Sequence, residues 1–286
     1  MILVFGATGR TGKAVVKALL EKQATVKVMV RQADKARDLF GEQVEIVEGE
    51  IVDQAALAKA FKGVSKVYLL LGNSETQLSL EKRITDMAVE CGVKLLVKQS
   101  SMESLEASDK PIPALHVESE KYIKSSGLNW VMIRPTFFAQ MLLTCARGVT
   151  TADTLSFPLR NGVVAVTDAR DVAEVAAKVL TESGHENKSY DLTGPELLSF
   201  NTIAALLSRT TERQITYKDM PLETYRAILS NVIDDEWRVN AVCEELDALA
   251  HNCVTHITGT IEQLLGRPPR SAADFLTDYK AAFMPQ

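Results

Sequence analysis

The chain has 286 residues and a formal net charge of -5, and 46% of its residues are hydrophobic. This length suits one large α/β domain, or one domain with a smaller lobe, around a sizeable core. The negative charge argues against nucleic-acid binding, because no basic excess is available for phosphates. The apolar start, Met1–Phe5, is too short to span a membrane and lacks the pattern of a signal peptide. We therefore expect a cytoplasmic protein with no membrane and no nucleic-acid partner.

The first strand is predicted at Ile2–Phe5, and the sequence Gly-Ala-Thr-Gly-Arg-Thr-Gly at residues 6–12 separates it from a helical pattern at Lys13–Lys22. In this order the glycines permit a tight turn, a close approach of a ligand to the backbone, and close packing of helix on strand. The first amides of the helix then face an anion. An ordinary strand-to-helix turn does not explain three glycines at this spacing. The pattern predicts a dinucleotide site with contacts from Gly6, Thr8, Gly9, Arg10, Thr11 and Gly12.

The second strand, Thr25–Val30, alternates and is followed by Arg31 and, four residues later, Lys35. In a dinucleotide fold this strand end faces the adenosine ribose, where an acidic residue favours NAD and an arginine favours the 2′-phosphate of NADP. Arg31 is suited to bidentate phosphate binding, and Lys35 adds a second positive charge. The alternative for Arg31 is a solvated strand end. We predict NADP(H) as the cofactor.

Two further strands are predicted at Val44–Val47 and Lys66–Leu71. After the first of them, Glu50 is a candidate acceptor for the adenine amine, and Asp53 is the expected N-cap of a helix at Gln54–Phe61. The second is a continuous apolar run, typical of a buried parallel strand. Its carboxyl end lies where the nicotinamide ribose is expected, so Gly72 and Asn73 are candidate contacts to the cofactor.

A helix at Glu81–Glu90 precedes the next strand, Lys94–Lys98, which ends at the same sheet edge with Ser100 and Ser101. Ser100 is a candidate donor to a developing oxyanion, and Ser101 a candidate cofactor contact. A structural role is the alternative for both serines. A helix at Leu115–Ser125 and a strand at Trp130–Ile133 follow.

Strands and helices alternate up to this point, which predicts a parallel, doubly wound α/β sheet of the Rossmann type. A strand at Val163–Val166, a helix at Asp171–Leu180 capped by Asp171 and a strand at Ser189–Leu192 come next. Beyond Ser199 the pattern is mostly helical, with a short strand near 214–217. We predict an NADP(H)-binding domain at 1–150. The remaining strands and a small, mostly helical substrate lobe, which does not fold independently, are predicted at 151–286.

The four cysteines are scattered, and we expect them to be reduced and buried (Cys91, Cys145, Cys243 and Cys253). Cys253 and His256 are close together, but no second pair accompanies them. No metal site is predicted.

Several segments together resemble the NmrA-like atypical short-chain dehydrogenases/reductases. They are the glycine motif, Arg31, the sequence IRPTFFAQML at 133–142 and the sequence GRPPRSAADF at 266–275. The stretch GHENKSYDLTGPELLSF at 184–200 resembles the branch of bacterial quinone reductases and triphenylmethane reductases. The resemblance implies an NADP(H)-binding Rossmann domain and a small C-terminal substrate lobe. It also implies divided functions, because some members reduce quinones or dyes, some act on specialised metabolites and some are redox sensors.

The chain departs from ordinary short-chain dehydrogenases, which use a Tyr-x-x-x-Lys pair. The corresponding helix carries His116 and Glu120, one turn apart on the same face, while Lys121 and Tyr122 lack the required spacing. A tyrosine-dependent alcohol dehydrogenase mechanism is therefore not expected. His116 is a candidate proton donor near neutral pH, with Glu120 orienting its ring; a purely structural His116 is the alternative.

Aromatic and apolar side chains after the strand at Trp130–Ile133 are candidates for contact with a planar substrate. They are Phe137, Phe138 and Met141, with core packing as the alternative for at least one, and Trp237 is a weaker candidate in the helical lobe.

We expect a monomeric or homodimeric reductase that transfers a hydride from NADPH to a quinone-like or other conjugated aromatic small molecule. Positioning of the nicotinamide and a single hydrogen-bond donor suffice for such an acceptor, since hydride addition yields a stabilised oxyanion. Two alternatives remain open. One is an NADP(H)-binding sensor without turnover, and the other is a biosynthetic reductase or isomerase with one specialised substrate.

Overall fold

The computed structural model describes residues 1–106 and 109–285, and they form two compact units. The first unit comprises Met1–Ser101, Leu115–Arg134 and Val172–Asp191, and the second comprises Met102–Ala114, Pro135–Asp171 and Leu192–Gln286. The chain passes between the units several times, so this division differs from the single boundary predicted at residue 150. The assignment of a cofactor-binding and a substrate-binding role to the two parts remains a prediction.

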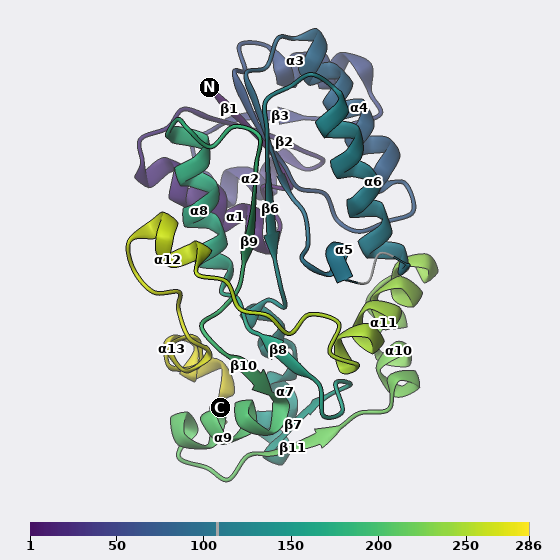
Figure 1. The fold of residues 1–286 in the computed structure, drawn as a ribbon, viewed down its shortest axis with the longest axis vertical. Helices are drawn as coiled ribbons and strands as arrows, with labels where there is room; N and C mark the ends of the chain where they lie inside the picture. Colours follow the sequence, from purple (N-terminus) through teal and green to yellow (C-terminus); the bar gives the residue numbers. More distant parts are fainter. Residues whose placement is uncertain (107–108, 286) are drawn as a thin grey trace. The chain divides into compact units, whose positions relative to one another are not determined.

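A seven-stranded sheet with the order β3-β2-β1-β4-β5-β6-β9 is the centre of the first unit (Figure 1). Its strands are β1 (Ile2–Phe5), β2 (Val26–Val30), β3 (Glu45–Glu48), β4 (Lys66–Leu69), β5 (Leu95–Gln99), β6 (Trp130–Pro135) and β9 (Lys188–Leu192). Neighbouring strands from β3 to β6 pair in parallel. The strand order reverses between β1 and β4, and ligands of such sheets bind at the carboxyl ends of the strands beside this point. The predicted α/β Rossmann-type sheet is confirmed.

Helices cover both faces of this sheet (Figure 1). On one face lie α3 (Gln54–Phe61), α4 (Gln77–Glu90) and α6 (Pro111–Ser125), whose apolar residues share a core with alternate residues of the strands. On the other face lie α1 (Arg10–Glu21) and α8 (Ala169–Thr181). Because both faces are covered, β1, β2 and β5 are buried along their whole length. The apolar run at Ile2–Phe5 predicts this for β1, whereas the alternating pattern of β2 does not.

Two predicted helix caps have different outcomes. The Asp53 carboxylate accepts hydrogen bonds from the amides of Ala55 (2.9 Å) and Ala56 (3.2 Å), which confirms it as the N-cap of α3. The prediction that Asp171 caps α8 is wrong, because α8 begins two residues earlier and Asp168 accepts from the amide of Arg170 at 2.8 Å. Asp171 is buried in the first turn and instead accepts from the amide of Arg270 at 2.7 Å.

The second unit is mostly helical, as predicted. Its helices are α5 (Glu103–Glu106), η1 (Ala139–Cys145), α7 (Ala146–Ala152), α9 (Phe200–Thr211), α10 (Leu222–Ser230), α11 (Glu236–Ala250), α12 (Thr260–Leu265), α13 (Ala272–Asp278) and η2 (Lys280–Phe283). Four short strands form two pairs: β8 (Val163–Ala165) with β10 (Leu197–Ser199), and β7 (Thr154–Phe157) with β11 (Thr216–Asp219). Their common core is built on Phe157 and Phe200, whose rings stack with centroids 5.0 Å apart.

The cysteines are free thiols, of which Cys145 and Cys243 are buried. Cys253 is half-buried and Cys91 is exposed, so the expectation that all four are buried is wrong, most clearly at Cys91. It lies just after the last turn of α4, where the helix end meets solvent.

Candidate functional site

The glycine loop between β1 and α1 has no space for side chains at two of its three glycines. Gly6 has a φ of +69°, and a Cβ there would lie 2.5 Å from the carbonyl oxygen of Leu70. A Cβ on Gly12 would lie 2.0 Å from the carbonyl oxygen of Gly6. At Gly9 the corresponding distance to the Gly6 oxygen is 3.2 Å, which is tight but not forbidden. The turn and the close helix–strand packing expected from the glycine spacing are both present.

The N-terminus of α1 is suited to an anion. Gly9 occupies the N-cap position and brings no side-chain acceptor to the first turn. The first backbone bond of the helix runs from the amide of Lys13 to the carbonyl of Gly9 at 3.0 Å. The backbone amides of the first turn, before Lys13, point out of the helix at the positive end of its dipole. This is the arrangement that holds the pyrophosphate of a dinucleotide. The residues present therefore fit such a cofactor, with Thr8, Arg10 and Thr11 in or beside the loop.

Arg31 and Lys35 lie where the adenosine ribose is expected. Arg31 directly follows β2, and Lys35 is the third residue of α2 (Ala33–Phe40); both are exposed. Neither side chain has a hydrogen bond or an ion pair within the described residues. Both charges are thus available to a phosphate, consistent with the predicted contact to a 2′-phosphate.

Arg83, which was not predicted as a site residue, binds the loop after β3. Arg83 on α4 donates from Nε to the carbonyl of Ile51 (3.0 Å) and from Nη2 to that of Val52 (3.1 Å). The loop carries the exposed Glu50, the candidate acceptor for the adenine amine. In the loop after β4, Gly72 has open space around the position of a Cβ, so packing does not require glycine there.

A buried ion pair lies between β5 and α4. Lys98 donates to both carboxylate oxygens of Glu81, at 2.8 and 2.7 Å, and the two side chains are 0% and 1% exposed. Ser119 on α6 and Gln77 on α4 also donate to this carboxylate. Burial alone would raise the pKa of Glu81, but Lys98 outweighs it and the pKa is lowered. The pair is therefore charged, with its carboxylate fully engaged.

His116 on α6 is next to this pair and is itself buried. Its Nδ1 has no hydrogen-bond partner among the described residues. Burial, and then the charge of Lys98, lower the pKa of the imidazole to about 3, against the opposing effects of Glu81 and Glu120. The ring is neutral at pH 7. The lowered pKa does not favour the predicted proton donor that titrates near neutrality, and a catalytic part for His116 remains a prediction.

Glu120 does not orient His116 as expected. Its carboxylate accepts from Arg134 (Nε, 2.8 Å; Nη2, 2.5 Å) and from Lys124 (2.8 Å). Burial raises its pKa, but the bonds from Arg134 and Lys124 prevail and hold it at about 2. Arg134 also reaches Asp191 at 3.3 Å, so Glu120 belongs to an ion-pair network that ties α6 to β6 and β9.

Ser100 is buried at the carboxyl end of β5, and its amide donates to the carbonyl of Ile133 at 2.7 Å. Its hydroxyl lies beside the Glu120 carboxylate, but outside hydrogen-bond geometry with any described group. Ser101 is also buried and does have a partner. Among the described residues of the first unit, three buried side-chain atoms have no hydrogen-bond partner: Ser100 Oγ, His116 Nδ1 and Gln77 Oε1. Such atoms are uncommon in folded proteins and are candidates for contact with a ligand or water.

The proposed substrate contacts lie in the second unit. Phe137 is 6% exposed and packs edge-on against Phe157, with ring centroids 5.8 Å apart. It is a core residue, so the structure does not support the prediction that it faces a substrate. Phe138, Met141 and Trp237 are half-buried and retain exposed surface.

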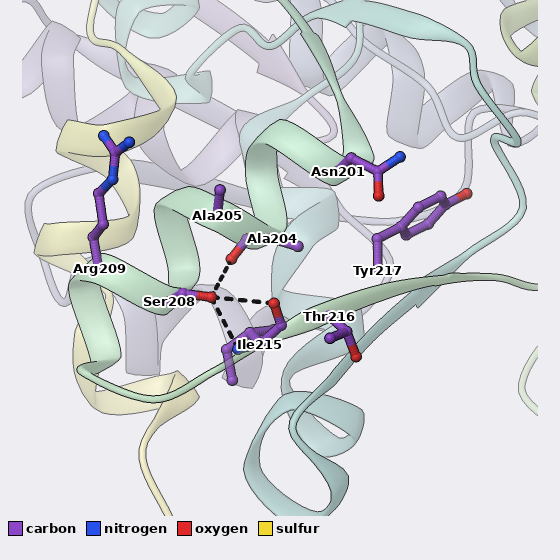
Figure 2. A pocket seen from close by; sticks show the side chains of 8 residues that line it. All are labelled: Asn201, Ala204, Ala205, Ser208, Arg209, Ile215, Thr216 and Tyr217. Carbon is purple, nitrogen blue, oxygen red and sulfur yellow. Dashed lines mark hydrogen bonds between the residues drawn. The ribbon is translucent and has the colours of Figure 1, made fainter.

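The second unit also has an open groove of about 580 Å³ between α9 and β11. Figure 2 shows its lining: Asn201, Ala204, Ala205, Ser208, Arg209, Ile215, Thr216 and Tyr217. Ser208 Oγ bonds to the carbonyl of Ala204 (2.8 Å) and accepts from the amide of Ile215 (2.9 Å), so its hydroxyl joins the helix to the strand. None of the predicted site residues lines this groove.

Within residues 1–106 and 109–285, no three His, Cys, Asp or Glu side chains are grouped so that they could hold a metal ion. Over the same residues, none of the helices is long and apolar enough to cross a membrane.

The glycine cradle, the sheet order and the full length of the chain can be compared with known proteins. The model of the NmrA-like family matches residues 1–264. The chain belongs to this family. A member at 34% identity is the NAD(P)H azoreductase of Xenophilus azovorans, aligned over 99% of both chains. Quinone oxidoreductase 2 of Escherichia coli is 25% identical over 96% of both.

Solved structures of family members share the fold. The NADPH complex of the Escherichia coli quinone oxidoreductase has a TM-score of 0.87 at 24% identity, covering 98% of this chain and 100% of that one. Triphenylmethane reductase of Citrobacter sp. has a TM-score of 0.86 at 25% identity, covering 99% of both. These relatives are NAD(P)H-dependent reductases, and the chain is a member of a family of NAD(P)-binding oxidoreductases.

The buried Glu81–Lys98 ion pair was not predicted, although the pattern of apolar residues around both positions indicates it. Lys98 stands inside an apolar strand, and Glu81 shares a helix face with Ile84 and Ala88. A charge on each of two otherwise apolar faces indicates a buried pair. For Arg134 and Arg83 there was no comparable signal, since Arg134 stands at the end of a strand, where a charge is ordinarily solvated, and Arg83 follows the charged residue Lys82.

Proposed function

We propose that this protein is an NADPH-dependent oxidoreductase that transfers a hydride to a quinone-like or other conjugated aromatic acceptor. The observation that carries the proposal is the glycine cradle at α1 combined with Arg31 and Lys35, two unpaired cations at the end of the neighbouring strand. The cradle suits a pyrophosphate, and the two cations suit a 2′-phosphate. In this proposal the first unit binds the cofactor.

The bound cofactor supplies the hydride; the chain supplies binding, orientation and hydrogen bonds. Hydride addition to a quinone leaves negative charge on an oxygen. Ser100 Oγ and neutral His116 are the two buried, unpartnered groups able to donate to such an oxyanion. A charged acid is unnecessary, since the aromatic product delocalises the charge. This fits an imidazole kept neutral by burial.

The named relatives favour the same class of acceptor. An azoreductase, a quinone oxidoreductase and a triphenylmethane reductase are, by their names, enzymes of conjugated aromatic compounds. The solved quinone oxidoreductase and triphenylmethane reductase share the fold over nearly the whole length of the chain.

The test is oxidation of NADPH, followed at 340 nm, with a panel of benzoquinones, naphthoquinones, azo dyes and triphenylmethane dyes. We expect turnover with at least one class. Arg31→Ala is expected to weaken NADPH binding by roughly tenfold to a hundredfold and NADH binding much less, because the lost guanidinium contacts only the phosphate.

The matched control is Arg37→Ala, on the helix α2 that follows Arg31, whose side chain is paired with Asp34 at 2.7 Å. Equal effects of Arg31→Ala on both cofactors would remove the 2′-phosphate assignment. Tight NADPH binding with no oxidation across the panel would favour a sensor without turnover. Turnover confined to compounds outside the panel would favour a specialised biosynthetic enzyme.

A further inference from the structure

A carboxylate lies near Arg31 and Lys35, the two cations proposed to bind the 2′-phosphate. Glu48 is the last residue of β3 and is paired in register with Val30, the residue before Arg31. Its Oε1 accepts a hydrogen bond at 3.2 Å from the amide of Ala33, the first residue of α2. The N-cap residue of α2, Gln32, makes no side-chain bond, so Glu48 caps this helix from the neighbouring strand.

This hydrogen bond fixes a negative charge beside Arg31 and Lys35. No ion pair joins Glu48 to either cation in the described part of the chain, because its carboxylate is directed to the helix amide. The other carboxylate of the first turn, Asp34, is neutralised by Arg37 at 2.7 Å. Within the described residues, Glu48, at the end of β3 and beside the end of β2, therefore has no cationic partner; Glu50, two residues later in the loop, has none either.

The charge has opposite consequences for the two nicotinamide cofactors. A carboxylate at this place accepts a hydrogen bond from the 2′-hydroxyl of an NADH ribose. The same carboxylate repels a 2′-phosphate by Coulomb forces and occupies a helix amide that the phosphate would otherwise receive.

We propose that Glu48 is a specificity-determining residue which offsets Arg31 and Lys35 and so allows the protein to use NADH as well as NADPH. This inference rests on the dinucleotide site of the proposed function. It attributes the choice between NADPH and NADH at that site to the negative charge of Glu48 and the opposing positive charges of Arg31 and Lys35.

The test uses Glu48→Gln, which keeps an oxygen acceptor for the Ala33 amide and removes only the charge. Dissociation constants are measured by titration calorimetry for NADPH, NADH and the fragments 2′,5′-ADP and 5′-ADP. We expect the preference for NADPH over NADH to rise about tenfold, with the same change for 2′,5′-ADP over 5′-ADP.

The matched control is Glu42→Gln. Glu42 is exposed in the turn before β3, at the opposite end of that strand, and its replacement changes the net charge equally. Glu48→Asp, which keeps the charge, is expected to keep most of the wild-type preference for NADH. Thermal unfolding of each variant checks that the site is intact, and Glu48→Ala provides a second neutral variant.

An unchanged preference in both neutral variants, in a protein that binds both cofactors, overturns the inference and leaves the proposed function standing. An equal shift in Glu42→Gln also overturns it, since the effect would then be one of net charge. Failure of the wild-type protein to bind NADPH, NADH and both fragments overturns the dinucleotide site, and the inference with it.

Discussion

His116 shows how burial changes the chemistry of a single side chain. An exposed histidine titrates near neutrality and can exchange a proton with a substrate. In this protein the imidazole is buried near the charge of Lys98, which lowers its pKa to about 3. Its unpartnered Nδ1 retains the ability to form a hydrogen bond. In the proposed function, a neutral imidazole would stabilise charge on an oxyanion without itself becoming charged.

Replacement of His116 tests this role. His116→Ala is expected to lower turnover with a quinone by roughly a hundredfold, the effect of losing one oxyanion donor, and to leave NADPH affinity unchanged. His116→Gln, which keeps an N–H donor, should recover part of the rate. The measurement is steady-state NADPH oxidation with a parallel binding titration. A wild-type rate in His116→Ala would limit His116 to a structural role.

The strand–loop–helix element formed by β1, the glycine loop and α1 is the part of the site defined most strictly by backbone geometry. Its helix lies so close to the turn that a Cβ at Gly12 would overlap the carbonyl of Gly6. The contact is between two backbone segments, which relax less readily than side chains. The sequence predicted this element because its three glycines have a local geometric cause that needs no information about distant residues.

Gly12→Ala tests the packing of this element. We expect it to destabilise the protein by about 3 kcal/mol and to abolish dinucleotide binding, since α1 must move away from β1. Gly72→Ala is the matched control for stability, because its Cβ would meet open space. Thermal unfolding of both variants provides the comparison. Equal melting temperatures would show that the close approach of α1 is not required.

Other elements were predicted less well because their partners lie far away in the sequence. The helix α6 was predicted from Leu115 but begins at Pro111, and Glu120 was assigned to His116, four residues away, when it binds Arg134. Phe137 follows a strand that leads to the site, yet its ring packs against Phe157 and Phe200. Helical spacing shows which side chains share a face, and it does not show what that face meets.

At the scale of the whole molecule, buried ionisable groups in the first unit make stability depend on pH. The folded pKa of His116, about 3, is below the ordinary value of 6.5, so the unfolded chain binds a proton between these pH values that the folded chain does not. Stability therefore falls as the pH drops below 6.5. The folded pKa of Glu120, about 2, is below the ordinary value of 4.5, so a further loss of stability follows as the pH falls below 4.5.

Between pH 6.5 and 4.5, His116 is expected to contribute a slope of about 1.4 kcal/mol per pH unit. His116→Gln should remove this part of the slope, and His256→Gln, at an exposed position, should not. The slope is measured by urea unfolding at several pH values. The fluorescence of Trp130 reports the unfolding, in a Trp237→Phe background, so that the first unit is observed alone. An unchanged slope in His116→Gln would show that the imidazole is charged in the folded protein.

By itself, the sequence determined the parallel α/β sheet, the dinucleotide cradle and the cations that follow the second strand. Each depends on local spacing: apolar runs of strand length, glycines three residues apart, and the residue at which a strand ends. The tertiary structure decided the ionisation of His116, the partners of Glu81 and Glu120 and the capping of α2 by Glu48. The contacts between separate elements join residues 14 to 38 positions apart, and they form only when the chain packs.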